Sequence, residues 1–293
     1  MSVFTGSAVA IITPFNEDGS IDYDSLADIL EWHVQEKTDG IVICGTTGEA
    51  STQTDEEQIE TIRFTVEKIG GRIPVIAGVG SNETLHAVKL SQLAEAAGAD
   101  ALLHVTPYYN KASTKGLIEH FTTIAASTKL PIILYSVPSR TGVNITPEIC
   151  VELAKVDNIV GIKEATGNIA QVAEISRVTP DDFDVYSGND DMIVPLLSVG
   201  GKGVISVVAN VAPRDTHDMV AKFFDGDWQG AMKLQLDMKP LIDALFIEVN
   251  PIPVKAAVSM LGQCKYAYRL PMTTLEQAHY DTLESEMKAY GLI

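Results

Sequence analysis

The sequence predicts an α/β protein in which the chain forms a (β/α)8 TIM barrel followed by a C-terminal helical extension. Two observations lead to this fold class: eight short apolar runs recur along the 293 residues, and amphipathic segments separate them. A third is size, because eight such units fill about 220 residues, close to what a closed barrel needs. An open doubly wound sheet is the second choice, but no GxGxxG motif follows the first run.

The expected strands are runs dense in Val, Ile, Leu and Ala, with turn-forming residues near their ends. Their apolar character is continuous rather than alternating, which is typical of parallel strands covered on both faces. In chain order the strands are expected at 8–15, 40–47, 74–80, 101–109, 131–138, 159–165, 183–190 and 203–210.

The segments between the strands have helical periodicity and helix-capping signals. They begin with Asp, Asn or Thr near acidic residues, and two of them end in glycine-containing stops. The clearest helices are expected at 22–37, 54–71, 82–100 and 146–156. Strand and helix together repeat roughly every 20 to 33 residues, as in a barrel.

The remaining residues, 225–293, are expected to be helical and to pack outside a barrel formed by 1–224. One helix is expected at 227–247, interrupted at Pro240, and two more at 251–262 and 274–291. Since the eight units are already placed, these helices form the extension. Their apolar faces require cover from the barrel or from another subunit.

Composition narrows the functional classes. The formal net charge of -18 argues against nucleic acid and anionic membranes as partners, since both bind clustered Lys and Arg. The cysteines Cys44, Cys150 and Cys264 are far apart and form no metal-binding spacing, so we expect reduced thiols and a cytoplasmic location. We expect no signal peptide, because the stretch MSVFTGSAVAIITPF lacks a basic region and a long apolar run, and no segment approaches the apolar length of a membrane span.

Lys163 is the most unusual residue of the predicted strands. It lies within the apolar run IVGIKEA, where an unpaired ammonium group is costly to bury. Taken alone, the simpler interpretation is a lysine that reaches solvent at a strand end. If it points into a barrel instead, strand alternation places Gly161 and Ala165 beside it. Burial then lowers the pKa of the amine, and a neutral amine forms a Schiff base with a ketone or aldehyde.

Further polar residues stand at the strand ends, where barrel active sites lie. The turn GTTGE could place Thr46 and Thr47 among backbone N–H groups suited to a carboxylate, although taken alone an ordinary tight turn is the favoured interpretation. Tyr135 also lies near a strand end, although it could simply pack in the core with its hydroxyl bonded to a backbone group. Arg140 lies in a loop over the mouth, where its guanidinium suits a carboxylate.

Six motifs together resemble the dihydrodipicolinate synthase family. They are GTTGEAS, VTPYYN, LYSVPSRTG, GIKEATGN, YSGNDD and NPIPVK, found in this order between residues 45 and 255. The resemblance therefore covers essentially the whole chain. The wider superfamily includes N-acetylneuraminate lyase and other pyruvate aldolases, which share the barrel and the Schiff-base lysine.

The resemblance implies roles for four catalytic residues. Lys163 forms a Schiff base with pyruvate, and Tyr135 moves protons together with Thr46. Tyr109 completes this relay from a neighbouring subunit, which implies an oligomer, with a dimer of dimers expected. The implied reaction joins pyruvate to L-aspartate 4-semialdehyde and needs no metal or organic cofactor.

The resemblance also implies the binding residues. Thr47 holds the pyruvate carboxylate, Arg140 holds that of the second substrate, and Gly188 and Ile205 line the pocket. The family usually has asparagine after the strand-five tyrosine, where this sequence has Ser136; we expect activity to persist.

Some family members bind lysine as a feedback inhibitor, and Asn82 and Tyr108 match positions used there. Gln58 and His86 replace a histidine and an acidic residue of that site. We therefore expect lysine inhibition to be weak or absent.

Two alternative functions stay open at this point. Another pyruvate-dependent lyase has the same lysine, tyrosine and threonines, although Arg140 and SGNDD favour the synthase. A catalytically inactive sensor is expected to lack the lysine or the relay, and both are present.

Overall fold

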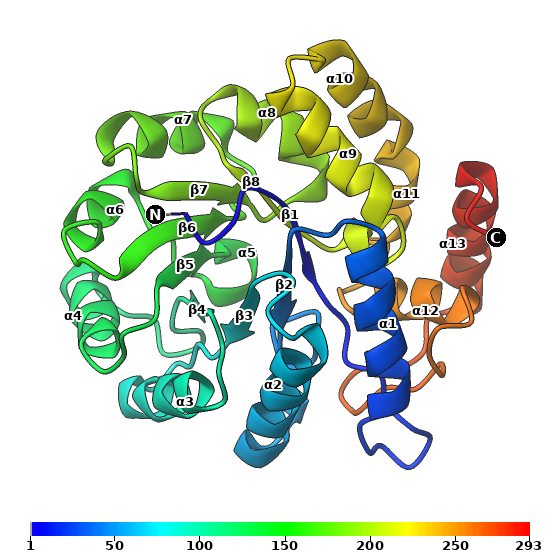
Figure 1. The fold of residues 1–293 in the computed structure, drawn as a ribbon, viewed down its shortest axis with the longest axis horizontal. Coiled ribbons are helices and arrows are strands. Elements are labelled where there is room, and N and C mark those ends of the chain that lie inside the picture. Colours follow the sequence, from blue (N-terminus) through cyan, green and yellow to red (C-terminus); the bar gives the residue numbers. More distant parts are fainter. Residues whose placement is uncertain (1) are drawn as a thin grey trace.

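The computed structural model describes residues 2–293 and contains eight parallel strands that close into a barrel in chain order. Figure 1 shows the strands as a ring with helices around it. The predicted fold class is confirmed. The strands are β1 (Gly6–Ala10), β2 (Gly40–Ile43), β3 (Val75–Gly78), β4 (Ala101–Val105), β5 (Ile132–Ser136), β6 (Ile159–Glu164), β7 (Asp184–Ser187) and β8 (Gly203–Ser206).

Most strands end earlier than the apolar run that predicts them. The run at 40–47, for example, gives a strand that stops at Ile43, because Cys44 turns the chain with a positive φ of 54°. The rest of each run continues into a loop. The polar residues at the ends of the runs therefore belong to the loops around the mouth of the barrel.

Nine helices accompany the strands within the described part of the barrel. They are α1 (Tyr23–Gln35), α2 (Asp55–Ile69), α3 (Thr84–Ala96), α4 (Thr114–Ala125), α5 (Pro138–Thr141), α6 (Pro147–Leu153), α7 (Ile169–Val178), α8 (Ile193–Ser198) and α9 (Pro213–Phe224). Two of the predicted caps are confirmed: Asp22 caps α1, and the Thr54 hydroxyl and the Glu57 carboxylate form a capping box at the start of α2. α3 is capped by Glu83 instead, and Thr146 makes no side-chain cap bond at α6. Three short 3-10 turns are η1 (Ala50–Thr52), η2 (Asp190–Met192) and η3 (Val208–Asn210).

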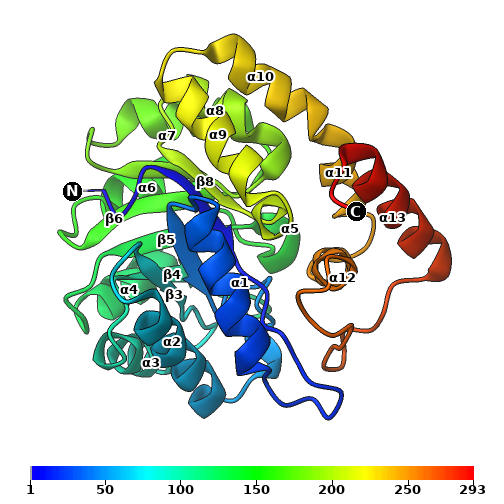
Figure 2. The same ribbon diagram turned by 45° about the vertical axis from the view of Figure 1, so that its right-hand side comes forward.

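The C-terminal extension is helical, as expected, and lies beside the barrel (Figure 2). It consists of α10 (Trp228–Asp237), α11 (Lys239–Ala244), α12 (Ile252–Met260) and α13 (Gln277–Tyr290). Pro240 occupies the first turn of α11, where its missing N–H breaks no helical hydrogen bond. α12 packs against η3, and α13 packs against α11 and α12. In the stretch from 2 to 293, no helix is both long enough and apolar enough to cross a bilayer.

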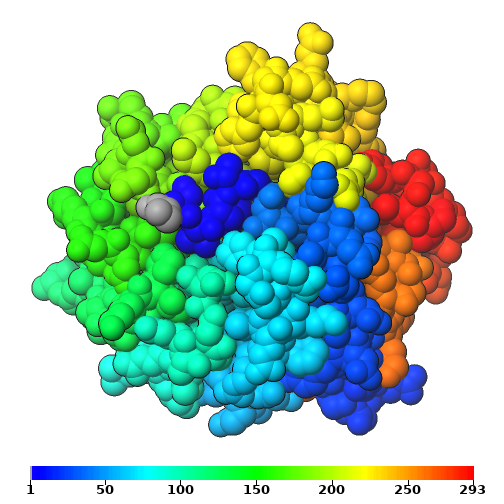
Figure 3. All heavy atoms as spheres, viewed as in Figure 1, coloured from blue at the N-terminus to red at the C-terminus, as the bar shows by residue number. Residues whose placement is uncertain are grey.

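Two apolar layers form the core. Inside the barrel, residues such as Ala8, Val42 and Ile133 form one cluster, while the opposite faces of the strands pack against the helices in a second. Phe4 closes the N-terminal end of the barrel: its ring stacks on Tyr186 at 4.3 Å, and its carbonyl accepts a 2.8 Å hydrogen bond from the Tyr186 hydroxyl. Figure 3 shows the N-terminal residues over the centre of this face.

Candidate active site

The Lys163 amine lies inside the barrel. β6 places it with Ala165 on the interior face, while Ile162 belongs to the outer core, as strand alternation predicts. The residue is 5% exposed, and its Nζ lies 4.6 Å from the centre of the Tyr135 ring. Burial lowers the pKa of Lys163 to about 8; the Asp190 carboxylate opposes this shift and the Arg140 guanidinium adds to it. The ammonium form still predominates at neutral pH, but the neutral amine is far more populated than for a lysine in water.

Small residues make room around this amine. A Cβ on Gly188 would lie 2.6 Å from the Ala165 Cβ and 3.1 Å from the Lys163 Cε. Gly161 is equally confined, since a Cβ added there would lie 2.4 Å from the Asp184 carbonyl oxygen. Strand neighbours set the walls, because Lys163 pairs in register with Tyr135 on one side and Tyr186 on the other. Tyr186, which sequence reasoning did not single out, closes the floor.

Tyr135 and Thr46 are brought together, as the sequence predicts. The Thr46 side chain lies near enough to the Tyr135 phenol to act on its pKa, and Thr46 itself is exposed in the turn after β2. Burial raises the pKa of the Tyr135 phenol, against the opposing effects of the Arg140 guanidinium and the Thr46 side chain. The phenol therefore holds its proton at neutral pH and is able to donate it. Lys163, Tyr135 and Thr46 form a connected group at the C-terminal ends of β6, β5 and β2.

Asn250 connects Thr47 and Arg140, the two residues predicted to bind carboxylates. The sequence did not single out Asn250 for the site. Arg140 is exposed on α5, and its Nη2 donates a 3.0 Å hydrogen bond to the carbonyl oxygen of Asn250. The Asn250 side chain in turn donates to the Thr47 hydroxyl at 3.1 Å. Asn250 thus holds both residues at the mouth. The signal for it was the NPIPVK motif, which contributed only to the family resemblance.

Asp190 is a second residue that sequence reasoning left without a role. It is buried at the start of η2, and its Oδ2 accepts hydrogen bonds from the backbone N–H groups of Val207 and Val208 at 3.0 and 2.8 Å. Burial raises the pKa of this carboxyl group, while its backbone hydrogen bonds and Lys163 counteract the shift. Asp190 is the anion that acts electrostatically on the Lys163 amine. In the sequence, Asp190 belongs to the motif SGNDD at the end of the seventh strand.

Ile205 belongs to the cluster inside the barrel and has no exposed surface, and Gly188 lies beside Ala165 and Lys163. Ser136 is directed away from this wall: its hydroxyl donates to Asn144 Oδ1 at 3.1 Å and accepts from the Ile145 N–H. The departure from the usual asparagine therefore lies outside the barrel interior.

Tyr109 is the predicted catalytic residue that the single chain does not bring to Lys163. Its side chain is 94% exposed, and its backbone has a positive φ of 70°, which is rare for tyrosine. The adjacent Tyr108 is 41% exposed, and its carbonyl oxygen accepts a 3.1 Å hydrogen bond from the Asn82 amide. Asn82 and Tyr108 are therefore neighbours, as the predicted lysine site requires.

The chemistry of this arrangement follows from its parts. An amine with a lowered pKa is a nucleophile toward carbonyl carbon, and a Schiff base on it withdraws electrons from the adjacent carbon. A phenol and a nearby hydroxyl are able to pass protons to and from that carbon. The guanidinium and hydroxyl at the mouth suit carboxylates. The barrel is therefore built for carbon–carbon bond formation on a small keto acid.

Comparison with known proteins agrees with this chemistry. A family model described as the dihydrodipicolinate synthetase family matches residues 3–290. The chain is 56% identical over 291 residues to the 4-hydroxy-tetrahydrodipicolinate synthase of Acetivibrio thermocellus, covering 99% of each chain. It is similar to the crystal structure of dihydrodipicolinate synthase from Aquifex aeolicus, with a TM-score of 0.97, 44% identity and 99% coverage of both chains. It also resembles the chloride-inhibited enzyme of Acinetobacter baumannii complexed with pyruvate, with a TM-score of 0.97, 42% identity and 99% coverage of both.

Proposed function

The chain belongs to the dihydrodipicolinate synthetase family, and on that premise we propose how its residues carry out the 4-hydroxy-tetrahydrodipicolinate synthase reaction. This activity is that of a lyase of lysine and diaminopimelate biosynthesis, and its substrates are pyruvate and L-aspartate 4-semialdehyde. The observation that carries the proposed mechanism is the buried Lys163 amine with its pKa of about 8, beside Tyr135.

Pyruvate binds first and becomes attached to Lys163. The neutral amine attacks the C2 carbonyl carbon, the carbinolamine loses water, and a protonated imine results. The imine draws electrons from the methyl carbon, which loses a proton to give an enamine. Tyr135 and Thr46 carry protons in these steps, which is supported by the nearness of their side chains and by the protonated phenol. Thr47 holds the pyruvate carboxylate.

The second substrate completes the reaction. The enamine carbon attacks the aldehyde carbon of L-aspartate 4-semialdehyde, and the new alkoxide takes up a proton. The amino group of this substrate then adds to C2, closes the ring and displaces the Lys163 amine, which returns to its starting state. Arg140 holds the second carboxylate, and Gly188 and Ile205 shape the pocket.

We assign Tyr109 to the site of a neighbouring subunit, within a dimer of dimers. Its exposed side chain and its unusual backbone conformation support this assignment, because no contact among residues 2–293 accounts for a tyrosine held outward. In this arrangement the phenol of Tyr109 joins the relay of Tyr135 and Thr46 from across the interface.

Borohydride reduction in the presence of pyruvate tests the mechanism. The expected result is a covalent adduct on Lys163, located by mass spectrometry of peptides, and none in a Lys163→Met variant. A Tyr135→Phe variant should still form the adduct but turn over roughly 100- to 10,000-fold more slowly, the usual contribution of a general acid–base. Absence of an adduct in the natural chain, or an adduct elsewhere, contradicts the mechanism.

A substrate screen separates the synthase from other pyruvate lyases. We expect product only from pyruvate with L-aspartate 4-semialdehyde, and no cleavage of N-acetylneuraminate or 2-keto-3-deoxy sugar acids. Preferential cleavage of a sugar acid contradicts the assignment of Arg140 to a second carboxylate.

We propose weak or absent inhibition by lysine at Asn82 and Tyr108. His86 stands where an acidic residue would attract the lysine amine, and its ring contacts Asp55 Oδ1 at 2.9 Å and the Ser81 hydroxyl at 3.0 Å. The Asp55 carboxylate is also engaged by Lys89 at 2.7 Å, so its charge is already balanced. Initial rates should be unchanged at sub-millimolar lysine; strong inhibition in that range contradicts the proposal.

A cytoplasmic location belongs to the same proposal. Its support is that Cys44, Cys150 and Cys264 are all free thiols, as a reducing compartment maintains them.

A further inference from the structure

A completely buried ion pair lies behind the threonine turn. The Lys255 ammonium group on α12 donates a 2.5 Å hydrogen bond to Glu49 Oε1, and the two side chains are 0% and 1% exposed. Glu49 is the last residue of GTTGE, so the pair joins the C-terminal extension to the strand-two end of the site. Neither residue touches Lys163 in the described contacts, and the mechanism above does not use them.

The surroundings of the pair are largely apolar. The Lys255 Nζ lies 3.9 Å from the centre of the Phe15 ring and 5.3 Å from that of Tyr268. Burial lowers the pKa of Lys255, and the Glu49 carboxylate counteracts this shift. The second carboxylate oxygen of Glu49 has no hydrogen-bond partner among residues 2–293. Pairs of this kind are commonly no more stabilising than apolar residues of the same size, so stability does not explain this one.

The pair instead fixes the shape of the turn. Glu49 has a left-handed backbone with φ 55° and ψ 35°, which is uncommon for a residue with a side chain. Its N–H donates to the carbonyl oxygen of Thr46 at 3.1 Å, closing the turn that presents Thr46 and Thr47. Because the Glu49 carboxylate is tied to α12, this strained residue has little freedom to relax.

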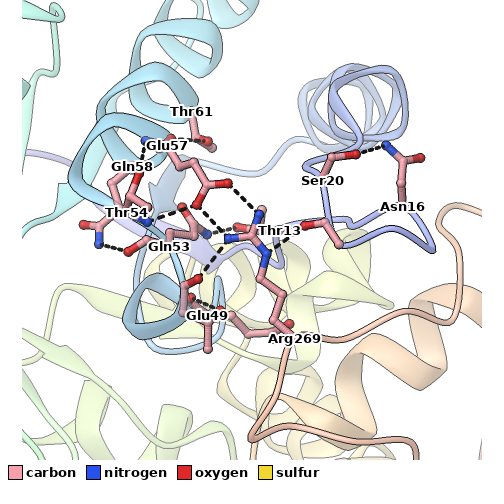
Figure 4. Close-up of polar contacts among 12 residues, drawn as sticks. Thr13, Asn16, Ser20, Glu49, Gln53, Thr54, Glu57, Gln58, Thr61 and Arg269 are labelled. Atoms are coloured by element: carbon pink, nitrogen blue, oxygen red, sulfur yellow. Dashed lines mark hydrogen bonds and ion pairs between the residues drawn. The ribbon is translucent and has the colours of Figure 1, made fainter.

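Two further contacts tie the same C-terminal segment to this turn. Asn250, just before α12, holds the Thr47 hydroxyl. Arg269, farther along the chain beyond α12, donates to the Thr52 carbonyl oxygen. It also donates to both carboxylate oxygens of Glu57, and Figure 4 shows this pair with Glu49 nearby. The segment 250–269 thus contacts residues 47–57 through Asn250, Lys255 and Arg269. The Lys255–Glu49 pair lies between the other two contacts in the sequence.

We infer that Lys255 and Glu49 are positioning residues for the proton relay, holding Thr46 against Tyr135 through the backbone of the turn. This inference rests on the proposed roles of Thr46 and Tyr135. It assigns the C-terminal extension a part in catalysis, because α12 supplies the cation that fixes the turn. Displacement of a catalytic group by about 1 Å is enough to slow a reaction roughly 100-fold.

The test compares single and double variants of the pair. Lys255→Met and Glu49→Met alone leave one buried charge unpaired and should lower the unfolding temperature markedly. The double Lys255→Met, Glu49→Met variant removes both charges and should recover most of that stability. A control variant on the exposed pair of the same extension, Lys288→Met with Glu284→Met, should behave as the natural chain.

Three readouts then separate positioning from mere stability. In the stable double variant, borohydride trapping of pyruvate on Lys163 should persist. Exchange of the pyruvate methyl protons with deuterium, which needs the relay but no second substrate, should slow roughly 10- to 100-fold. kcat should fall by a similar factor, with a smaller change in KM for pyruvate.

The outcomes are distinct for the two proposals. Failure of the natural chain to trap pyruvate overturns the proposed mechanism itself. Normal trapping in the natural chain, combined with natural exchange and kcat in the double variant, overturns the positioning role alone. If the double variant does not fold, Lys255→Arg takes its place: it keeps the charge but alters its geometry, so slowed exchange supports the inference and unchanged exchange contradicts it.

Discussion

At the scale of single residues, the burial that makes the Lys163 amine reactive also lowers the free energy of unfolding. Burial lowers its pKa from 10.5 to about 8, so the charged amine is disfavoured in the folded chain relative to the unfolded one. At about 1.4 kcal/mol per pKa unit, the penalty is about 3 kcal/mol. Because the unfolded chain binds more protons between pH 8 and 10.5, stability increases with pH across that window. The penalty is fully present below about pH 8.

A Lys163→Met variant should therefore be inactive yet more stable. We expect its free energy of unfolding to exceed that of the natural chain by up to about 3 kcal/mol at pH 7, because methionine fills similar space without charge. The difference should shrink from pH 8 to 10.5, as urea titrations at several pH values would show. An exposed control, Lys129→Met, should give no such difference. A destabilised Lys163→Met chain contradicts the prediction.

At the scale of elements, the close approach of β6 and β7 shapes the space around the amine. The Gly188 N–H donates to the Glu164 carbonyl oxygen at 2.7 Å, which brings the end of β7 against the residue after Lys163. Glycine is needed here for space, since a Cβ would lie 2.6 Å from the Ala165 Cβ and 3.1 Å from the Lys163 Cε. The strand ends thus determine where the reactive atom lies.

A Gly188→Ala variant should disturb both packing and catalysis. Overpacking of this kind costs about 1–3 kcal/mol, and displacement of the amine should lower kcat/KM for pyruvate roughly 10- to 100-fold. Steady-state kinetics and thermal unfolding measure the two effects. The control is Gly116→Ala on α4, where the nearest atom to a Cβ is Ser113 Oγ at 3.5 Å; it should retain activity. Natural kinetics in Gly188→Ala contradict the close-packing argument.

At the scale of the whole molecule, the barrel and the extension act together on one end of the strands. Phe4 and Tyr186 close the opposite end, and Asn250 and Lys255 bring the extension to the open one. Tyr109 is the one predicted catalytic residue that does not lie at this end of its own barrel. We propose that it contributes to the active site of a second subunit.

Mixing two inactive variants tests that exchange between subunits. Lys163→Met chains keep Tyr109, and Tyr109→Phe chains keep Lys163, so a mixed dimer has one site with both groups. Co-refolding equal amounts should restore about a quarter of the natural activity by random pairing of protomers, whereas each variant refolded alone stays at its own level. No recovery in the mixture contradicts a role for Tyr109 across an interface.

Much of this protein was determined by the sequence alone. Continuous apolar runs predict buried parallel strands, because a strand covered on both faces has no solvent face to mark with polar residues. The period of strand and helix then predicts the barrel, and strand alternation places Gly161, Lys163 and Ala165 together on the interior. The common mouth of the strand ends predicts that Lys163, Tyr135 and Thr46 lie near one another. The roles of Tyr135 and Thr46 in a proton relay followed only from the family resemblance.

The tertiary structure decided what depends on contacts between distant parts of the chain. The boundaries of strands were missed because an apolar run does not reveal where the backbone turns, as at Cys44. Asn250 and Lys255 lie about 200 residues from Thr47 and Glu49, and periodicity carries no information about such pairs. The pKa of Lys163 was predictable in direction from burial, but its value depends on Asp190 and Arg140. The alternation of residues along a strand determines whether a side chain points into the barrel or toward the helices. The residues that it contacts there are determined only by how distant parts of the chain pack together.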